Sequence, residues 1–86
     1  MEKSIELKAK IRQFIMDTTF SQPELVKNDT LIFIQGIFDS MGFISLCNFI
    51  EEAFAVKILD TDLLEENFES VNAISNFIES KLNLHN

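Results

Sequence analysis

The chain has 86 residues, of which 47% are apolar and 24% are charged, and 7 basic against 14 acidic side chains give a formal charge of −7. The apolar share is that of a folded domain and argues against intrinsic disorder. A chain this short is expected to form a single domain over residues 1–86, too small for a large enzyme with a deep two-lobed active site. Its acidity disfavours binding to nucleic acid and to anionic membranes, and favours basic patches on protein partners.

The acidic side chains are concentrated in the later part of the chain. Residues 1–27 hold five bases and four acids, whereas residues 28–86 hold two bases and ten acids. We therefore expect a partner protein to bind the later part of the chain.

The first predicted element is an amphipathic helix over residues 4–18. Its apolar face is predicted to comprise Leu7, Ile11, Phe14, Ile15 and Thr18. Pro23 prevents continuation of this helix because proline lacks the amide proton and clashes with the preceding turn. Residues 19–39 are then a long connection, and a loop of that length in a small domain is often functional.

A second helix is predicted to begin at Asp39-Ser40 and to run to about Ala55. Its buried stripe is predicted to comprise Phe43, Leu46, Cys47, Ile50 and Phe54. Met41 and Ile44 fall outside that stripe. Burial of Phe54 predicts that Phe54→Ala costs about 3–5 kcal/mol.

Two further helices are predicted in the remainder of the chain. Asp60-Thr61-Asp62 supplies capping side chains for a helix of one to two turns around residues 63–66. Ser70 is predicted to cap the last helix. The buried face of that helix is predicted to comprise Val71, Ile74, Ser75, Ile78 and Leu82. The prediction is an all-α four-helix bundle, with three main helices, one short helix and a long loop between the first and second.

The single cysteine allows no disulfide within the chain, so the fold must depend on packing. The first residues lack the apolar stretch of a secretory signal, and no apolar run approaches the length needed to span a membrane. We expect a cytoplasmic monomer.

Ser40 is the strongest candidate for a chemical role. It follows an acid and a long loop, and it opens a helix whose exposed amide groups carry a positive partial charge. A phosphate ester on its hydroxyl would be stabilised at that position. The alternative interpretation is that Asp39 or Ser40 is simply the N-cap, a position that favours both residue types.

Residues 36–46, with the sequence GIFDSMGFISL, resemble the Asp-Ser-Leu/Met segment of acyl carrier proteins. The resemblance continues in FIEEAF, DTDL, ENF and SVNAI, which follow in the order and at the spacing of that family, and it covers about residues 4–83. It implies a four-helix bundle that is a carrier and not an enzyme.

The resemblance also implies a role for the residues at the start of the second helix. It makes Ser40 the attachment point of 4′-phosphopantetheine, which a separate, magnesium-dependent phosphopantetheinyl transferase takes from coenzyme A, and it makes Asp39 a recognition residue for that transferase. The terminal thiol of the arm would carry an acyl or aminoacyl group as a thioester from a loading enzyme (adenylating or acyl-transferring) to downstream acceptor enzymes of a biosynthetic pathway.

The same resemblance implies that four other residues are docking positions for partner enzymes. Met41 and Ile44 are its apolar positions, and Glu51 and Glu52 are its acidic positions. The alternatives are packing under the long loop or ordinary surface positions for Met41 and Ile44, and a solvated helix face for the two glutamates.

The sequence departs from fatty-acid carrier proteins in the first turns of the second helix. Gly42 and Ser45 stand where those proteins commonly have acids, which makes the chain more similar to D-alanyl and stand-alone aminoacyl carriers. Phe43 is bulky for a position that lines the acyl cavity in that family, which favours a small or surface-exposed cargo.

Other kinds of site are disfavoured by the residues present. Cys47 is predicted to be a buried structural thiol, and one cysteine with His85 cannot form a zinc site. Asp60 and Asp62 lack the glycine and the further ligands of a calcium loop.

The competing function for the whole protein is a carrier-like helical bundle that is never modified and acts as an interaction module. Such a module has little reason to keep Asp39-Ser40.

Overall fold

The computed structural model describes residues 2–20 and 22–82, so His85 lies outside the described residues. The described chain contains four α-helices, two short 3₁₀ helices and no strand. These elements are α1 (Glu2–Thr19), η1 (Pro23–Leu25), α2 (Ser40–Phe54), η2 (Asp60–Asp62), α3 (Glu65–Phe68) and α4 (Val71–Leu82). The predicted all-α bundle, with three main helices, one short helix and a long loop after the first, is confirmed. Within this part of the chain, no helix combines the length and the apolarity needed to cross a bilayer.

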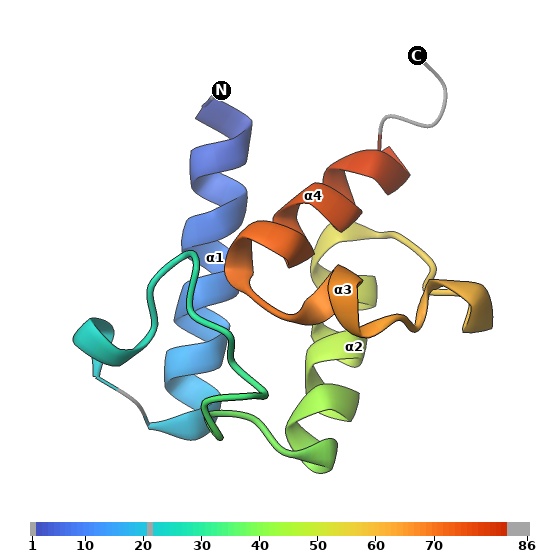
Figure 1. Cartoon of the computed structure of the whole chain (residues 1–86). Helices are drawn as coiled ribbons and strands as arrows, with labels where there is room; N and C mark the ends of the chain where they lie inside the picture. Colours follow the sequence, from blue (N-terminus) through green and yellow to red (C-terminus); the bar gives the residue numbers. More distant parts are fainter. Residues whose placement is uncertain (1, 21, 83–86) are drawn as a thin grey trace.

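Helix α1 packs against α4 and α2, and α3 packs against α4 (Figure 1). Each main helix contributes fully buried side chains to the common core. These include Ile11 and Ile15 of α1, Leu46 and Ile50 of α2, and Ile74 and Ile78 of α4. Removal of these side chains from water is the main stabilising contribution, at roughly 25 cal/mol for each Å² of apolar surface.

The predicted apolar faces are confirmed at their centres and wrong at their ends. Thr18 is exposed and Leu82 is 51% exposed, because each lies in the last turn of its helix. In α2 the stripe is only partly buried, since Phe43, Cys47 and Phe54 are each half-buried.

The long connection between α1 and α2 is anchored to the bundle at several points. The Arg12 side chain donates from Nε to the carbonyl of Val26 at 2.9 Å, and the amide of Ile32 donates to the carbonyl of Glu69 at 3.0 Å. Val26 and Ile32 are themselves fully buried. The connection therefore holds the first turn of α2 in a fixed place relative to the start of α4.

The segment between α2 and α4 differs from its prediction. Asp60–Asp62 is itself a 3₁₀ helix, and the short α-helix starts at Glu65, two residues later than expected. The physical reason is that the Asp62 carboxylate accepts the amide of Leu59 at 2.9 Å and so closes the preceding turn. At the next boundary the prediction is confirmed, because Ser70 Oγ accepts the amide of Ala73 at 3.1 Å and caps α4.

Candidate functional site

The first turn of α2 is capped by Asp39 and not by Ser40. Asp39 has extended backbone angles (φ −110°, ψ −168°), and its Oδ1 accepts the amide of Gly42 at 2.9 Å. Ser40 is the first helical residue and is exposed, and its hydroxyl makes no hydrogen bond to any residue that the structure describes. Of the two candidate caps, Asp39 fills the role, which leaves the Ser40 hydroxyl free for chemistry.

Gly42 permits the close packing beneath this turn. A Cβ atom at Gly42 would lie 2.8 Å from Cδ1 and 3.1 Å from Cγ of the Phe38 ring, which is buried. Phe38 is in turn held by its amide, which donates to the carbonyl of Ile32 at 3.0 Å. Any larger residue at position 42, an acid included, would have to displace this ring. The missing acid at this position therefore has a local steric reason.

A groove of about 630 Å³ lies beside Ser40, between the long connection, the first turns of α2 and the chain from Leu63 to Phe68. Most of its lining is apolar, and the charged side chains in it are both acidic. The lining residues are Phe33, Ile34, Phe38, Asp39, Ser40, Phe43, Ile44, Leu63, Leu64, Glu65 and Phe68. The groove thus offers a largely apolar surface that includes Ser40 at its edge with α2.

Aromatic rings form the inner wall of the groove. The Phe43 ring meets the rings of Phe68 and Phe33 edge to face, with centroids 5.3 and 5.7 Å apart. Phe68 is 1% exposed, and its ring centroid lies 5.1 Å from that of Phe77 on α4. Phe43 thus lines the groove together with Phe38 and Phe68, which both belong to the buried core.

The two predicted apolar docking residues are exposed on α2. Met41 is 70% exposed and Ile44 is 54% exposed, so neither side chain packs under the long connection. Ile44 lines the groove, whereas Met41 lies on another face of the helix, beside Gly42 and Ser45. The structure therefore places one of these residues at the groove and the other next to it.

The two predicted acidic docking residues lie at the other end of α2. Glu52 is exposed, but Glu51 is half-buried and its Oε2 accepts the amide of Ile58 at 2.9 Å. Eleven residues separate Ser40 from Glu51, which corresponds to about 17 Å along the helix axis. Glu51 therefore has a structural partner within the chain, and neither glutamate is brought to the serine.

Cys47 is half-buried, where full burial was expected. Burial raises the pKa of its thiol, and the neighbouring carboxylate of Glu51 raises that pKa further. A thiol with a raised pKa is a poor nucleophile and a poor metal ligand at neutral pH. Among residues 2–20 and 22–82, no group of three or more His, Cys, Asp or Glu side chains is arranged to hold a metal ion.

Several groove residues were not predicted from the sequence. Phe33 and Phe38 precede α2, while Leu63, Leu64 and Phe68 follow its last residue by 9, 10 and 14 positions, and only the tertiary structure brings them together. The one local signal is the pair of adjacent leucines in an otherwise acidic stretch.

No protein-family model matches this sequence, and no curated protein matches it.

Proposed function

We propose that this protein is a non-catalytic acyl or aminoacyl carrier in which Ser40 bears 4′-phosphopantetheine. The observation that carries the proposal is the exposed, unbonded Ser40 hydroxyl at the start of a helix that Asp39 already caps, next to an apolar groove. The resemblance of residues 36–46 to acyl carrier proteins supports the same role.

The position of Ser40 suits a phosphodiester. In forming the ester, the Ser40 oxygen would bond to the phosphorus on the pantetheine side of coenzyme A, the pyrophosphate bond would break with adenosine 3′,5′-bisphosphate as the leaving group, and the hydroxyl proton would pass to a base on the transferase. The negative charge then lies at the N-terminus of a 15-residue helix, where the helix dipole and the unpaired amides stabilise it. When bound, the arm supplies a thiol that holds the cargo as a thioester.

The groove gives this chain a means of sheltering an apolar cargo. Apolar side chains from three segments line it, and each methylene group transferred from water is stabilised by roughly 0.8 kcal/mol. Because the ring of Phe43 packs edge to face against that of Phe68 at the inner wall, we propose that the cargo lies along the surface of the groove. This arrangement agrees with a short or partly exposed cargo.

The surface around Ser40 suits docking by partner enzymes. Met41 and Ile44 supply exposed apolar contacts, and the acidic later part of the chain steers basic partners toward it. The first turns of α2 carry no acid after Asp39, since Gly42 and Ser45 occupy those positions. On this ground the proposed carrier is more similar to D-alanyl and stand-alone aminoacyl carriers than to fatty-acid carriers. We propose separately that it acts as a cytoplasmic monomer.

The test is intact mass spectrometry after incubation with coenzyme A and a broad-specificity phosphopantetheinyl transferase. We expect the mass of one phosphopantetheinyl group to be gained, lost in Ser40→Ala and retained in Ser45→Ala, a matched change of an exposed serine on the same helix. Asp39→Asn keeps a capping side chain and is expected to slow the modification if the carboxylate contributes to transferase recognition.

The unmodified interaction module is the second candidate, and the exposure of Met41 and Ile44 favours it as well. The same experiment separates the two functions. An unchanged mass with every transferase would contradict the carrier and support the module.

A further inference from the structure

The chain between α2 and α3 forms one side of the groove, and we call residues 55–64 the strap. Its last two residues, Leu63 and Leu64, are groove-lining side chains that remain 46% and 50% exposed. Side chains this exposed are not held by packing alone, so their position depends on how the strap is fastened.

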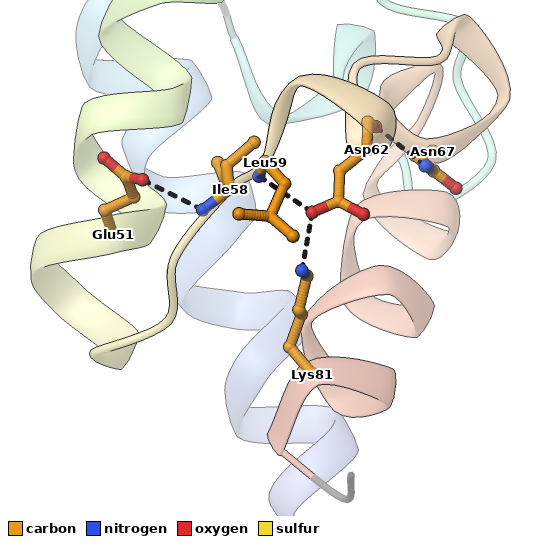
Figure 2. A network of polar contacts seen from close by, with 6 residues as sticks. All are labelled: Glu51, Ile58, Leu59, Asp62, Asn67 and Lys81. Atoms are coloured by element: carbon orange, nitrogen blue, oxygen red, sulfur yellow. Dashed lines mark hydrogen bonds and ion pairs between the residues drawn. The ribbon is translucent and has the colours of Figure 1, made fainter.

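Two carboxylates hold the strap in place (Figure 2). One belongs to Glu51 of α2, and the other to Asp62 of η2, which is itself part of the strap. Near its start, the carboxylate of Glu51 accepts the amide of Ile58 at 2.9 Å. Near its end, one carboxylate oxygen of Asp62 accepts the amide of Leu59 at 2.9 Å and binds the ammonium group of Lys81 on α4 at 2.5 Å. The Asp62–Lys81 pair thus joins the strap to a helix that packs against the core.

The backbone of Asp62 connects this pair to the groove wall. Its carbonyl accepts the amide of Leu64 and the side-chain amide of Asn67, each at 2.8 Å. Leu63 lies directly between the two bonded residues. A movement of Asp62 therefore moves both leucines of the wall.

Lys81 also lies near Phe77, whose ring packs against Phe68 of the inner wall. Its ammonium group lies 5.6 Å from the centroid of the Phe77 ring, which is itself in contact with the ring of Phe68. Lys57 is the other base in the later part of the chain, and it lies on the strap and is exposed. Lys81 is thus placed where one side chain bridges the outer and the inner wall of the groove.

We infer that Asp62 and Lys81 are positioning residues that hold Leu63 and Leu64 as the outer wall of the groove, and that their ion pair determines how firmly the groove retains an apolar cargo. The statement about the wall stands on the contacts alone. The statement about the cargo rests on the proposed function of Ser40.

The wall is tested in the protein without modification of Ser40. We expect Asp62→Asn and Lys81→Met to speed hydrogen exchange at the amides of Leu63 and Leu64 by about two- to tenfold. Lys57→Met removes the same charge from the strap and is expected to leave those rates unchanged. Equal exchange in all three variants and in the wild type would overturn the inference.

The cargo is tested on protein loaded through coenzyme A derivatives with butyryl, hexanoyl or octanoyl groups. In the wild type we expect the melting temperature to rise with chain length, and in Asp62→Asn and Lys81→Met we expect about half of that increment or less. Lys81→Arg restores the pair and is expected to restore the increment, which a loss of general stability would not predict. If the melting temperatures of both variants rose with chain length as much as that of the wild type, the ion pair would have no role in retaining the cargo.

The two proposals fail in different ways. If Ser40 takes no phosphopantetheine, the carrier function is contradicted while the exchange rates still decide the role of the pair at the wall. If Ser40 is modified but the wall and the increments do not respond to Asp62 or Lys81, the carrier stands and the positioning role is wrong.

Discussion

Where α1 packs against α4, the inward isoleucines of both helices (Ile11, Ile15, Ile74 and Ile78) are fully buried, whereas several apolar side chains that line the groove beside α2 are exposed (Ile34, Ile44, Leu63 and Leu64). The first region has the packing of a protein core, and the second keeps an open groove lined by phenylalanine and leucine. In a chain of this size the buried surface is limited, so an unfilled groove lowers the stability of the domain. The contrast separates a closely packed core, to which α2 and α3 also contribute Leu46, Ile50 and Phe68, from an open groove that presents the candidate site.

The largest difference between the two regions is expected for truncation of a core residue. Ile78→Ala should lower the free energy of unfolding by about 2–5 kcal/mol, because it leaves a cavity in the closed region. Ile44→Ala, the matched change at the groove, should alter it by about 0.5 kcal/mol or less, since Ile44 is exposed. Urea unfolding followed by circular dichroism measures both, and equal losses would remove the contrast.

Phe54→Ala tests the boundary between the two regions. Full burial would predict a loss of about 3–5 kcal/mol, but Phe54 is half-buried with its ring centroid 5.7 Å from that of Phe49. We therefore expect a loss of about 1–3 kcal/mol in the same unfolding experiment. A loss above that range would mean that the C-terminal end of α2 belongs to the closed region.

Gly42→Ala tests the packing at the start of the site. Alanine is ordinarily favoured over glycine within a helix by about 1 kcal/mol, but here its methyl group would overlap the buried ring of Phe38. We expect a net destabilisation of about 1 kcal/mol. Ser45→Ala, an exposed change in the same helix, is the control and should be neutral or slightly stabilising. An increase in stability for Gly42→Ala would show that the ring shifts without cost.

Ser75→Ala removes a polar atom from the closed region. Ser75 is fully buried, and its hydroxyl has no hydrogen-bond partner among the described residues. The substitution replaces this unsatisfied hydroxyl by hydrogen and leaves an apolar methyl side chain, which should raise the free energy of unfolding by about 1 kcal/mol. Ser80→Ala on the exposed face of α4 should change it much less. A destabilised Ser75→Ala protein would indicate that the hydroxyl is bonded in solution.

The smallest expected effect is a pH dependence confined to the strap. The hydrogen bond from Lys81 and then the amide of Leu59 lower the pKa of Asp62 below its ordinary value of 3.8. The stabilisation from a carboxylate with a lowered pKa is present above the ordinary value and is lost as the pH falls through the lowered one. The protection factor of the Leu64 amide, which compares its exchange rate with the intrinsic rate at the same pH, should therefore fall below about pH 4 in the wild type. In Asp62→Asn the protection factor should already be low at neutral pH, and an identical acid profile in that variant would contradict the assignment.

Local sequence patterns predicted the helices because each depends on near neighbours. Leu46 and Ile50 repeat at helical spacing, and the Ser70 cap acts on an amide three residues away. The same patterns were wrong at Thr18 and Leu82, because periodicity does not show where a neighbouring element ends.

The candidate site was only partly predictable. Asp39 and Ser40 could be located because they open a helix, although which of them caps it depended on side-chain geometry. The groove could not be predicted beyond Phe43, since its walls come from three separate segments. The prediction that Asp60-Thr61-Asp62 supplies the cap of the following helix was wrong, because the N-cap of α3 is Leu64 without a side-chain hydrogen bond. The Asp62 carboxylate instead binds Lys81, nineteen residues later, and the amide of Leu59.

The raised pKa of Cys47 has a consequence for a protein that handles thioesters. On the proposed function the cargo is attached through a thiol, and a second thiol in the same molecule can accept an acyl group by exchange. The attacking species is the thiolate, and burial together with the carboxylate of Glu51 raises the pKa of Cys47 and so disfavours that species. On the proposed function, this environment would slow transfer of the cargo from the arm to the cysteine of the domain itself.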